Sequence, residues 1–257
     1  MKIILLCLAL ALFGPLCAPA KATDAQAVER VVATGPLPCL TQALDLANRQ
    51  MRRMIEFGLL AGIGQSTQAG AGWKPGNPYY DRARGTLAQA LDEDEKTFGR
   101  LFSLTTESLL REWMARQPAD VAPWFADFLS RPAGKFYWKA MIDGAHCEGV
   151  VNGLRKWSGP WSDADTRAAQ ALLNDLAAAR NAFPAQLATL SKADQSEFDA
   201  GFKKLGGSLG PVAPSMMEKS MTSLEKRLGD AIQGRATELK ALAVRHRDHQ
   251  PLDDATP

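Results

Sequence analysis

The spacing of apolar residues from Cys39 onward constrains the fold more than any other feature of the chain. Apolar or small residues recur there in steps of three and four, as on one face of an α-helix. They are Leu40, Leu44, Ala47, Met51, Met54, Gly58 and Ala61. Alternation with a period of two, which marks a half-buried strand, is absent. Because helical spacing continues through most of the sequence, we expect an all-α protein.

Breaks in this spacing predict how the helices are organised. Ser130 and Pro132 suit the start of a new helix after an aromatic segment. The segment "WSGPW", residues 157–161, is the clearest later break, and we interpret it as a subdomain boundary. We therefore expect three parts after the leader: a helical bundle over residues 23–160, a helical extension over 161–248 and a disordered tail over 249–257.

Residues 1–22 have the features of a signal peptide. A short positive start precedes an apolar run over residues 3–13, which is too short to span a bilayer because a spanning helix needs ~20 residues. Small residues ending at Ala22 predict cleavage there. Cys17 leaves a lipid anchor as an alternative, although Leu16 before it is not a small residue. We expect a periplasmic or secreted protein with no transmembrane segment after cleavage.

Loss of the leader changes the charge balance. The full chain has 30 basic and 28 acidic residues, and the leader holds Lys2 and Lys21 but no acid. The mature chain is therefore neutral, with 28 residues of each sign. Nucleic-acid binding relies on a basic surface that neutralises phosphates, so we do not expect nucleic acid as a partner.

The mature chain keeps two cysteines, Cys39 and Cys147. In an oxidising compartment two cysteines most simply form one disulfide, here between the start of one long helix and the later turns of another. Closing a loop of ~100 residues contributes about 4–5 kcal/mol in the chain-entropy model. Two free thiols or a redox pair are the alternatives, and no Cys-x-x-Cys motif supports the redox one.

Three patterns that can carry chemistry have simpler structural explanations. Residues 206–210 match Gly-x-Ser-x-Gly, but no strand precedes them, so we interpret them as a linker. "HRDH", residues 246–249, offers only two imidazoles where a closed metal site needs three or four ligands, and a helix end is the simpler interpretation. His146 adjoins Cys147, which cannot act as a nucleophile if it is oxidised. We predict no catalytic residue, metal or cofactor.

Basic residues recur at steps of four along the helix that follows Pro132. Arg131, Lys135 and Lys139 therefore share a face, and the helix N-terminus adds partial positive charge near Arg131. Together they are a possible anion-binding site for a phosphate or carboxylate. The alternative is a solvated face, or salt bridges to the acidic run at residues 92–95.

Residues 65–80 read as a long loop rich in glycine and proline. Its rings, Trp73, Tyr79 and Tyr80, are possible contacts for a ligand or partner. Alternatively, they fold back and cover the core. The sequence alone leaves both interpretations open.

At "FADFLSRPAGKFYWKAM" the chain resembles a family of exported bacterial proteins known as domain of unknown function 2059. The family is marked by an aromatic helix and a serine-to-lysine corner, and the matching residues are Phe125, Phe128, Ser130, Pro132, Gly134 and Lys135. The chain departs at Leu129, where the family often has tyrosine, and by inserting Arg131. The resemblance covers about residues 105–150. It implies an all-helical periplasmic domain without an established activity.

Our leading hypothesis is a non-enzymatic envelope interaction or binding protein, which contacts an unknown envelope protein or a small ligand. A hydrolase of cell-envelope material is the first alternative, and a carrier of a small apolar ligand within the bundle is the second. An enzyme would show a concave pocket with a titratable group of shifted pKa. A carrier would show an apolar cavity, and an interaction protein would show an exposed apolar patch.

Overall fold

The structure, a computed structural model, describes residues 24–98, 105–157, 159–205 and 232–252. Every regular element in these ranges is a helix, which confirms the predicted all-α class. Three sequence predictions lie outside the described residues: the signal peptide with its cysteine, the Gly-x-Ser-x-Gly segment and the last residues of the tail.

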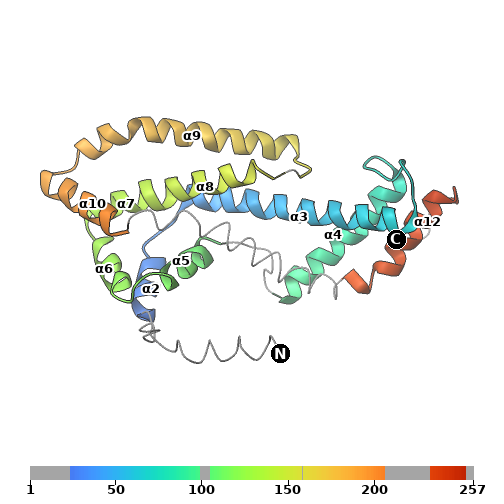
Figure 1. The fold of residues 1–257 in the computed structure, drawn as a ribbon, viewed down its shortest axis with the longest axis horizontal. Helices are drawn as coiled ribbons and strands as arrows, with labels where there is room; N and C mark the ends of the chain where they lie inside the picture. Colours follow the sequence, from blue (N-terminus) through green and yellow to red (C-terminus); the bar gives the residue numbers. More distant parts are fainter. Residues whose placement is uncertain (1–23, 99–104, 158, 206–231, 253–257) are drawn as a thin grey trace, which may run out of the picture.

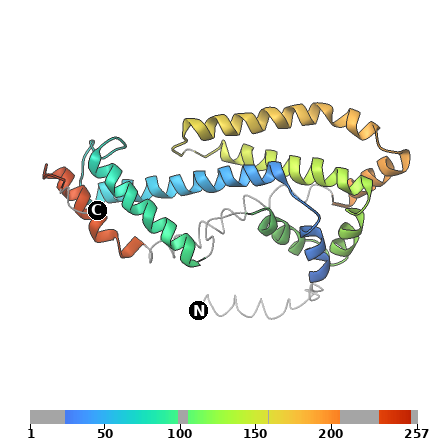
Figure 2. The same cartoon turned by 180° about the vertical axis from the view of Figure 1, so that it is seen from behind.

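The long helix α3 forms the axis of the molecule. It spans Pro38–Thr67 and runs along much of the structure (Figure 1). α8 (Ala145–Leu154) lies alongside α3, and α9 (Asp163–Ala188) packs on both, so three helices stack in layers (Figure 2). α3 contributes a face of buried apolar residues to this stack, including Leu40, Leu44, Leu46, Ala47, Met51 and Leu60.

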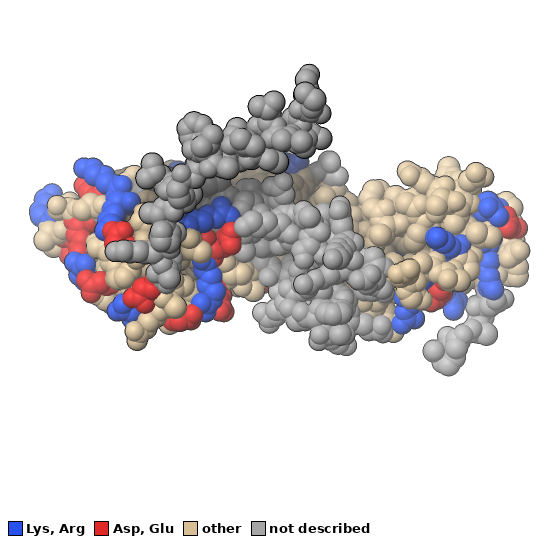
Figure 3. All heavy atoms as spheres, turned by 60° about the horizontal axis from the view of Figure 1, so that its bottom comes forward, with Lys and Arg blue, Asp and Glu red and all other residues tan. Residues whose placement is uncertain are grey.

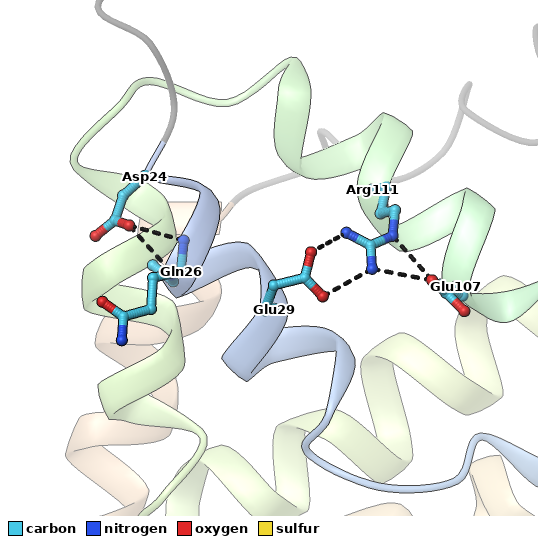
Figure 4. Close-up of polar contacts among 6 residues, drawn as sticks. Asp24, Gln26, Glu29, Glu107 and Arg111 are labelled. Atoms are coloured by element: carbon cyan, nitrogen blue, oxygen red, sulfur yellow. Dashed lines mark hydrogen bonds and ion pairs between the residues drawn. The ribbon is translucent and has the colours of Figure 1, made fainter.

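Shorter helices pack together beyond the start of α3 (Figure 1). They are α2 (Ala25–Val32), α5 (Thr106–Ala115), α6 (Val121–Phe128), α7 (Pro132–Tyr137) and α10 (Lys192–Leu205). Arg111 on α5 ties α2 to this group, because its guanidinium contacts Glu29 on α2 and Glu107 on its own helix (Figure 4). The Arg111 Nη2 atom lies 2.8 Å from Glu29 Oε2 and 2.9 Å from Glu107 Oε1.

The opposite end of the molecule holds α4 (Pro78–Phe98) and α12 (Ala236–Arg247), which pack on each other and on α3 (Figure 2). Arg247 donates from Nη1 to the backbone oxygen of Thr67, the last residue of α3, over 3.1 Å. Part of the predicted disordered tail is ordered here. Gln250 donates its backbone N–H to Arg245 O and accepts a hydrogen bond from the Tyr79 hydroxyl.

A disulfide joins the start of α3 to α8. The Cys39–Cys147 bond is present as predicted, with the two Cα atoms 5.7 Å apart. α3 has no capping side chain of its own, and Asp143 supplies the cap from the neighbouring π-helical segment η1 (Trp138–Gly144) by accepting from the Leu40 N–H over 2.7 Å. Burial raises the pKa of Asp143, and the backbone hydrogen bonds only partly oppose that shift.

The Ser-Arg-Pro-Ala-Gly corner is a packing device. Ser130 was expected to cap α7, but its hydroxyl instead donates to Asp127 O over 2.6 Å at the end of α6, because Arg131 occupies the N-cap position. A Cβ on Gly134 would lie 2.0 Å from the backbone oxygen of Phe128. Only glycine therefore lets α7 approach α6 this closely.

The buried face of α3 departs from the predicted one. Met54 is half-buried and Gly58 is exposed, whereas Ile55 and Leu60 are buried in their place. The cause is the length of the helix, because the contacts of α3 change from α8 and η1 at its start to α4 and α12 farther along. A face chosen by one continuous spacing therefore drifts away from the true contacts.

The segment predicted as a C-terminal extension shares the core of the bundle. α9 packs on α3 and α8, α10 packs on α7, and α12 packs on α3 and α4. Its buried apolar residues belong to the same continuous cluster as those of α3, and they include Leu172, Leu176, Phe198, Leu239 and Leu242. The break between α8 and α9 therefore lies within one core. None of the described helices has the length and hydropathy to cross a membrane.

Candidate functional site

The aromatic loop covers the core more than it faces solvent. Trp73 donates its indole N–H to Leu60 O over 2.9 Å, and Tyr80 packs edge-on against it with 5.4 Å between ring centroids. Both side chains are buried, so covering the core is what they do here. Tyr79 is half-buried, packs near His246 and holds the chain at Gln250. The loop is also shorter than predicted, because α3 extends to Thr67 and α4 starts at Pro78.

The predicted basic face does not gather into one anion site. Arg131 is ion-paired with Asp127 on α6, at 3.2 Å, and with Glu197 on α10. Lys135 and Lys139 are exposed on the outer surface. Acidic and basic groups alternate over this end of the molecule, at the left in Figure 3. The proposed alternative partner Asp92 instead pairs with Arg52, across 2.7 Å.

The histidine pattern "HRDH", residues 246–249, is part of the packing at the end of the molecule that holds α4 and α12. The His246 ring packs near Trp73, with 6.0 Å between ring centroids, and a Cβ on Gly72 would lie 3.0 Å from it. Among the described residues, no group of three or more His, Cys, Asp or Glu side chains is placed to hold a metal ion. His146 adjoins Cys147, whose sulfur is in the disulfide and is not a nucleophile.

A cleft of about 190 Å³ lies where the starts of α4 and α9 meet the middle of α3. Two proline-containing turns close its sides, one before α4 and one before α9. The lining residues are Arg53, Glu56, Phe57, Leu60, Pro75, Tyr80, Arg84, Pro160, Trp161 and Ser162. They come from α3, α4 and the two turns, the second of which ends at Ser162, the N-cap of α9, so the cleft exists only in the folded chain.

Local capping fixes both helix starts at the cleft. Asn77 Oδ1 accepts from the Tyr79 N–H over 3.0 Å at the start of α4. Ser162 Oγ accepts from the Asp165 N–H over 3.1 Å at the start of α9, a cap that the sequence pattern predicts. These bonds hold the first turns of α4 and α9 in place beside α3.

The floor of the cleft is a network of ion pairs. Glu56, almost fully buried, lies between Arg52 at 3.2 Å and Arg84 at 3.5 Å. Asp165, equally buried, pairs with Arg49 at 3.2 Å and with Arg53. With the pair between Arg52 and Asp92, four arginines face three carboxylates in this network. Counted over these ion pairs among the described residues, one positive charge is in excess.

The arginines of the floor repel one another. The pKa of Arg53 is lowered, first by burial of its guanidinium and then by the charges of Arg49 and Arg84. The group stays protonated at any physiological pH because arginine titrates far above it. Burial also raises the pKa of the Tyr80 hydroxyl in the wall of the cleft. An anion in the cleft would relieve the repulsion around Arg53.

The apolar wall of the cleft is unusually exposed. Phe57 has 50% of its surface accessible, and Phe202 on α10 is the only other large hydrophobic residue in the described part of the chain with comparable exposure. The half-buried Trp161 continues the apolar surface beside it, and the fully buried Leu60 also lines the cleft. A phenyl ring kept in contact with water next to arginines is the arrangement that a ligand or partner covers.

Gln50 lies on α3 one turn before Arg53 and is fully buried. Neither its amide oxygen nor its amide nitrogen has a hydrogen-bond partner among the described residues. The turn before α9 closes over it, since a Cβ on Gly159 would lie 2.7 Å from the Gln50 nitrogen. The chain at Gly159 is therefore packed tightly against α3, and the buried Gln50 amide beside it lacks a hydrogen-bond partner among the described residues.

Sequence reasoning missed the cleft residues Arg53, Phe57 and Arg84. The one local signal was Phe57, a large apolar residue off the predicted face of its helix. The residues that complete the site come from distant positions, and no spacing in the sequence links them. The basic face that was predicted came from periodicity within a single helix.

Comparison of the chain with protein-family models, with curated proteins and with solved structures found no match. The resemblance over residues 105–150 therefore stays a prediction. What the chain does has to be argued from the geometry and charge of the cleft.

Proposed function

We propose that this chain is a non-enzymatic binding protein of the cell envelope, and that its ligand occupies the cleft between α3, α4 and α9. The observation that carries the proposal is the half-exposed ring of Phe57 beside Arg53 and Arg84. An isolated surface ring needs no explanation, but one that lines a concave site with convergent charged groups fits a binding site.

A periplasmic or secreted location is part of the proposal. The Cys39–Cys147 disulfide supports it, because such bonds persist in oxidising compartments. The N-terminal signal pattern, with cleavage near Ala22, and the resemblance to an exported family point the same way. N-terminal sequencing of the exported protein tests this part, and a mature chain that begins at a lipidated Cys17 would contradict it.

The cleft supports binding better than the two alternatives. A hydrolase needs a group that exchanges a proton near neutral pH. Burial moves the pKa of the Tyr80 hydroxyl further above neutrality, Glu56 is held between Arg52 and Arg84, and the guanidinium groups do not titrate. A carrier of a purely apolar ligand needs an apolar cavity, and this floor is charged. A ligand with both a polar and an apolar part fits the lining.

The test is a panel of small aromatic molecules that differ only in charge: anionic, neutral and cationic. A bound compound raises the melting temperature of the protein by mass action. We expect at least one class to do so for the wild type and for the control Phe202→Ser, and to lose the effect in Phe57→Ser. If Phe57→Ser leaves binding unchanged, the ligand site lies elsewhere. Conversion of a panel compound into product would favour the hydrolase.

A further inference from the structure

Building on the proposed binding function, we infer that the cleft takes a carboxylate attached to one bulky apolar group, as in a free aromatic acid or the carboxy-terminal residue of a peptide. The carboxylate lies between Arg53 and Arg84, and the apolar group lies against Phe57. The observation that carries the inference is the meeting of two arginines and a half-exposed phenyl ring in one cleft.

The two arginines keep hydrogen-bond donors available. Arg53 uses Nη1 for Asp165 and for Ser162 Oγ, at 3.1 Å from the hydroxyl. Arg84 uses Nε for Glu56. A guanidinium carries five N–H donors, and the Nε and Nη2 groups of Arg53 and both Nη groups of Arg84 have no hydrogen-bond partner in the described part of the chain. These donors match the two oxygens of a carboxylate.

The charge of the network selects a singly charged anion. One positive charge is in excess, and a single carboxylate neutralises it. A phosphate monoester carries about −1.5 to −2 at neutral pH, so it would leave excess negative charge beside the buried Glu56 and Asp165. The arginines of the cleft disfavour a ligand that brings a cation.

The size of the cleft limits the apolar part. At about 190 Å³ it is smaller than the ~300–1,000 Å³ of a site for a drug-sized ligand. It therefore suits one side chain or one ring. The edge is open, because half of Phe57 and 53% of the Arg84 side chain are exposed, so the rest of a longer ligand can continue into solvent. These features fit a chain end better than the middle of a chain.

The experiment is isothermal titration of the full chain, with its disulfide intact, with N-acetyl-L-phenylalanine and with N-acetyl-L-phenylalaninamide. The two probes share a ring and differ only in the carboxylate. We expect the acid to bind and the amide to bind at least roughly tenfold more weakly, as loss of a charge-assisted hydrogen bond implies. Binding of the acid should also weaken as salt is raised, because Arg84 is half-exposed.

Variants place the carboxylate in the cleft. Arg84→Gln should weaken binding of the acid by roughly tenfold or more. Arg180→Gln, which removes an exposed arginine of α9 that pairs with Glu148 on α8, is the matched control and should leave binding unchanged. The amide probe is measured on the wild type, so the test survives if Arg84→Gln does not fold.

Two hexapeptides separate the sources of the carboxylate. Both end in phenylalanine, one with a free carboxyl end and one amidated. Tighter binding of the free-ended peptide than of the N-acetyl acid supports a peptide end, and equal binding supports a free acid; either result supports the shared chemistry. Equal binding of acid and amide overturns the inference, as does binding of the acid that Arg84→Gln leaves unchanged. If only neutral or cationic panel compounds protect the cleft, this inference fails and the proposed function stands.

Discussion

The corner between α6 and α7 and the cleft on α3 contain the same kinds of side chain, aromatic rings and arginines, in opposite states. At the corner Phe125 and Phe128 are fully buried, and Arg131 has a carboxylate partner on each side. In the cleft Phe57 is half-exposed and Arg53 is repelled by neighbouring arginines. A site is therefore marked by apolar surface and charge that folding leaves unsatisfied, and not by a density of rings.

Truncating one phenylalanine in each region should separate them most strongly. Phe125→Ala should cost about 3–5 kcal/mol of unfolding free energy, because it opens a cavity in a closed ring cluster. Phe57→Ala should change stability by no more than about 0.5 kcal/mol, since its ring is half in water. Urea unfolding followed by circular dichroism measures both. Similar losses for the two variants would erase the distinction between the regions.

Removing the disulfide that joins α3 to α8 should have the next largest effect on stability. This bond connects the helix that carries the floor of the cleft to the helix that follows the corner. Cys39→Ser with Cys147→Ser should lower stability by about 2–5 kcal/mol. The measurement is urea unfolding of the oxidised chain beside the double variant, with a reduced wild-type sample as control. Alkylation of both thiols in the exported protein under non-reducing conditions would show that the bond does not form.

The closed corner should not tolerate a methyl group. Gly134→Ala should cost about 1–3 kcal/mol or more, because the new Cβ would overlap the backbone oxygen of Phe128. Gly149→Ala in α8 is the matched control, since its Cβ would meet nothing within 4 Å. That variant should be stabilised by about 0.5–1 kcal/mol through helix propensity. Equal changes in stability for the two variants would show that α6 and α7 can move apart to admit the methyl group.

The stability that Asp143 contributes by capping α3 should depend on pH. Burial raises the pKa of Asp143, so its stabilising contribution is fully present below the pKa of the unfolded state, near 3.8, and is lost as the pH rises through the higher folded value. Asp143→Asn keeps an oxygen for the Leu40 N–H and removes this dependence. Its stability relative to wild type should therefore rise from pH 4 to pH 7.

Asp143→Ala is the control for the cap, because it removes the acceptor and should cost about 1–3 kcal/mol at both pH values. Denaturant midpoints at the two pH values give the comparison. If Asp143→Asn instead loses ground as the pH rises, the carboxylate stabilises the start of α3 more than its burial costs.

The smallest effect is expected beside the cleft. Gln50→Met should raise stability by about 1 kcal/mol, because it replaces a buried amide that has no partner among the described residues with an apolar group of similar length. Gln250→Met, at an exposed position after α12, is a control for the same chemical change. A loss of stability in Gln50→Met would mean that the amide makes a hydrogen bond essential to this end of the cleft.

The sequence predicted the features that depend on neighbouring residues or on a count of residues. Helical spacing predicted the all-α class, and two cysteines that remain after the leader predicted the bond between Cys39 and Cys147. Ser162 caps α9 by accepting from the Asp165 N–H, which lies only three residues along the chain. Each of these features needs only neighbours in the sequence or a count of residues.

The rest depends on tertiary contacts. Arg131 looked like part of an anion site until α10 placed Glu197 against it. Arg53 and Arg84 have nothing in the sequence to connect them, and they meet because α4 returns along α3. The buried face of α3 drifted from its predicted course for the same reason. Long-range packing decides which charges are satisfied, and that decides where a ligand can bind.

The most direct test of this account is a map of where N-acetyl-L-phenylalanine shifts backbone amide resonances of the ¹⁵N-labelled protein. We expect changes at residues 53–60, 80–84 and 161–162, with none along residues 131–139. The opposite pattern, with shifts along residues 131–139 and a silent cleft, would show that the basic face beside the corner is the site and that the account is wrong.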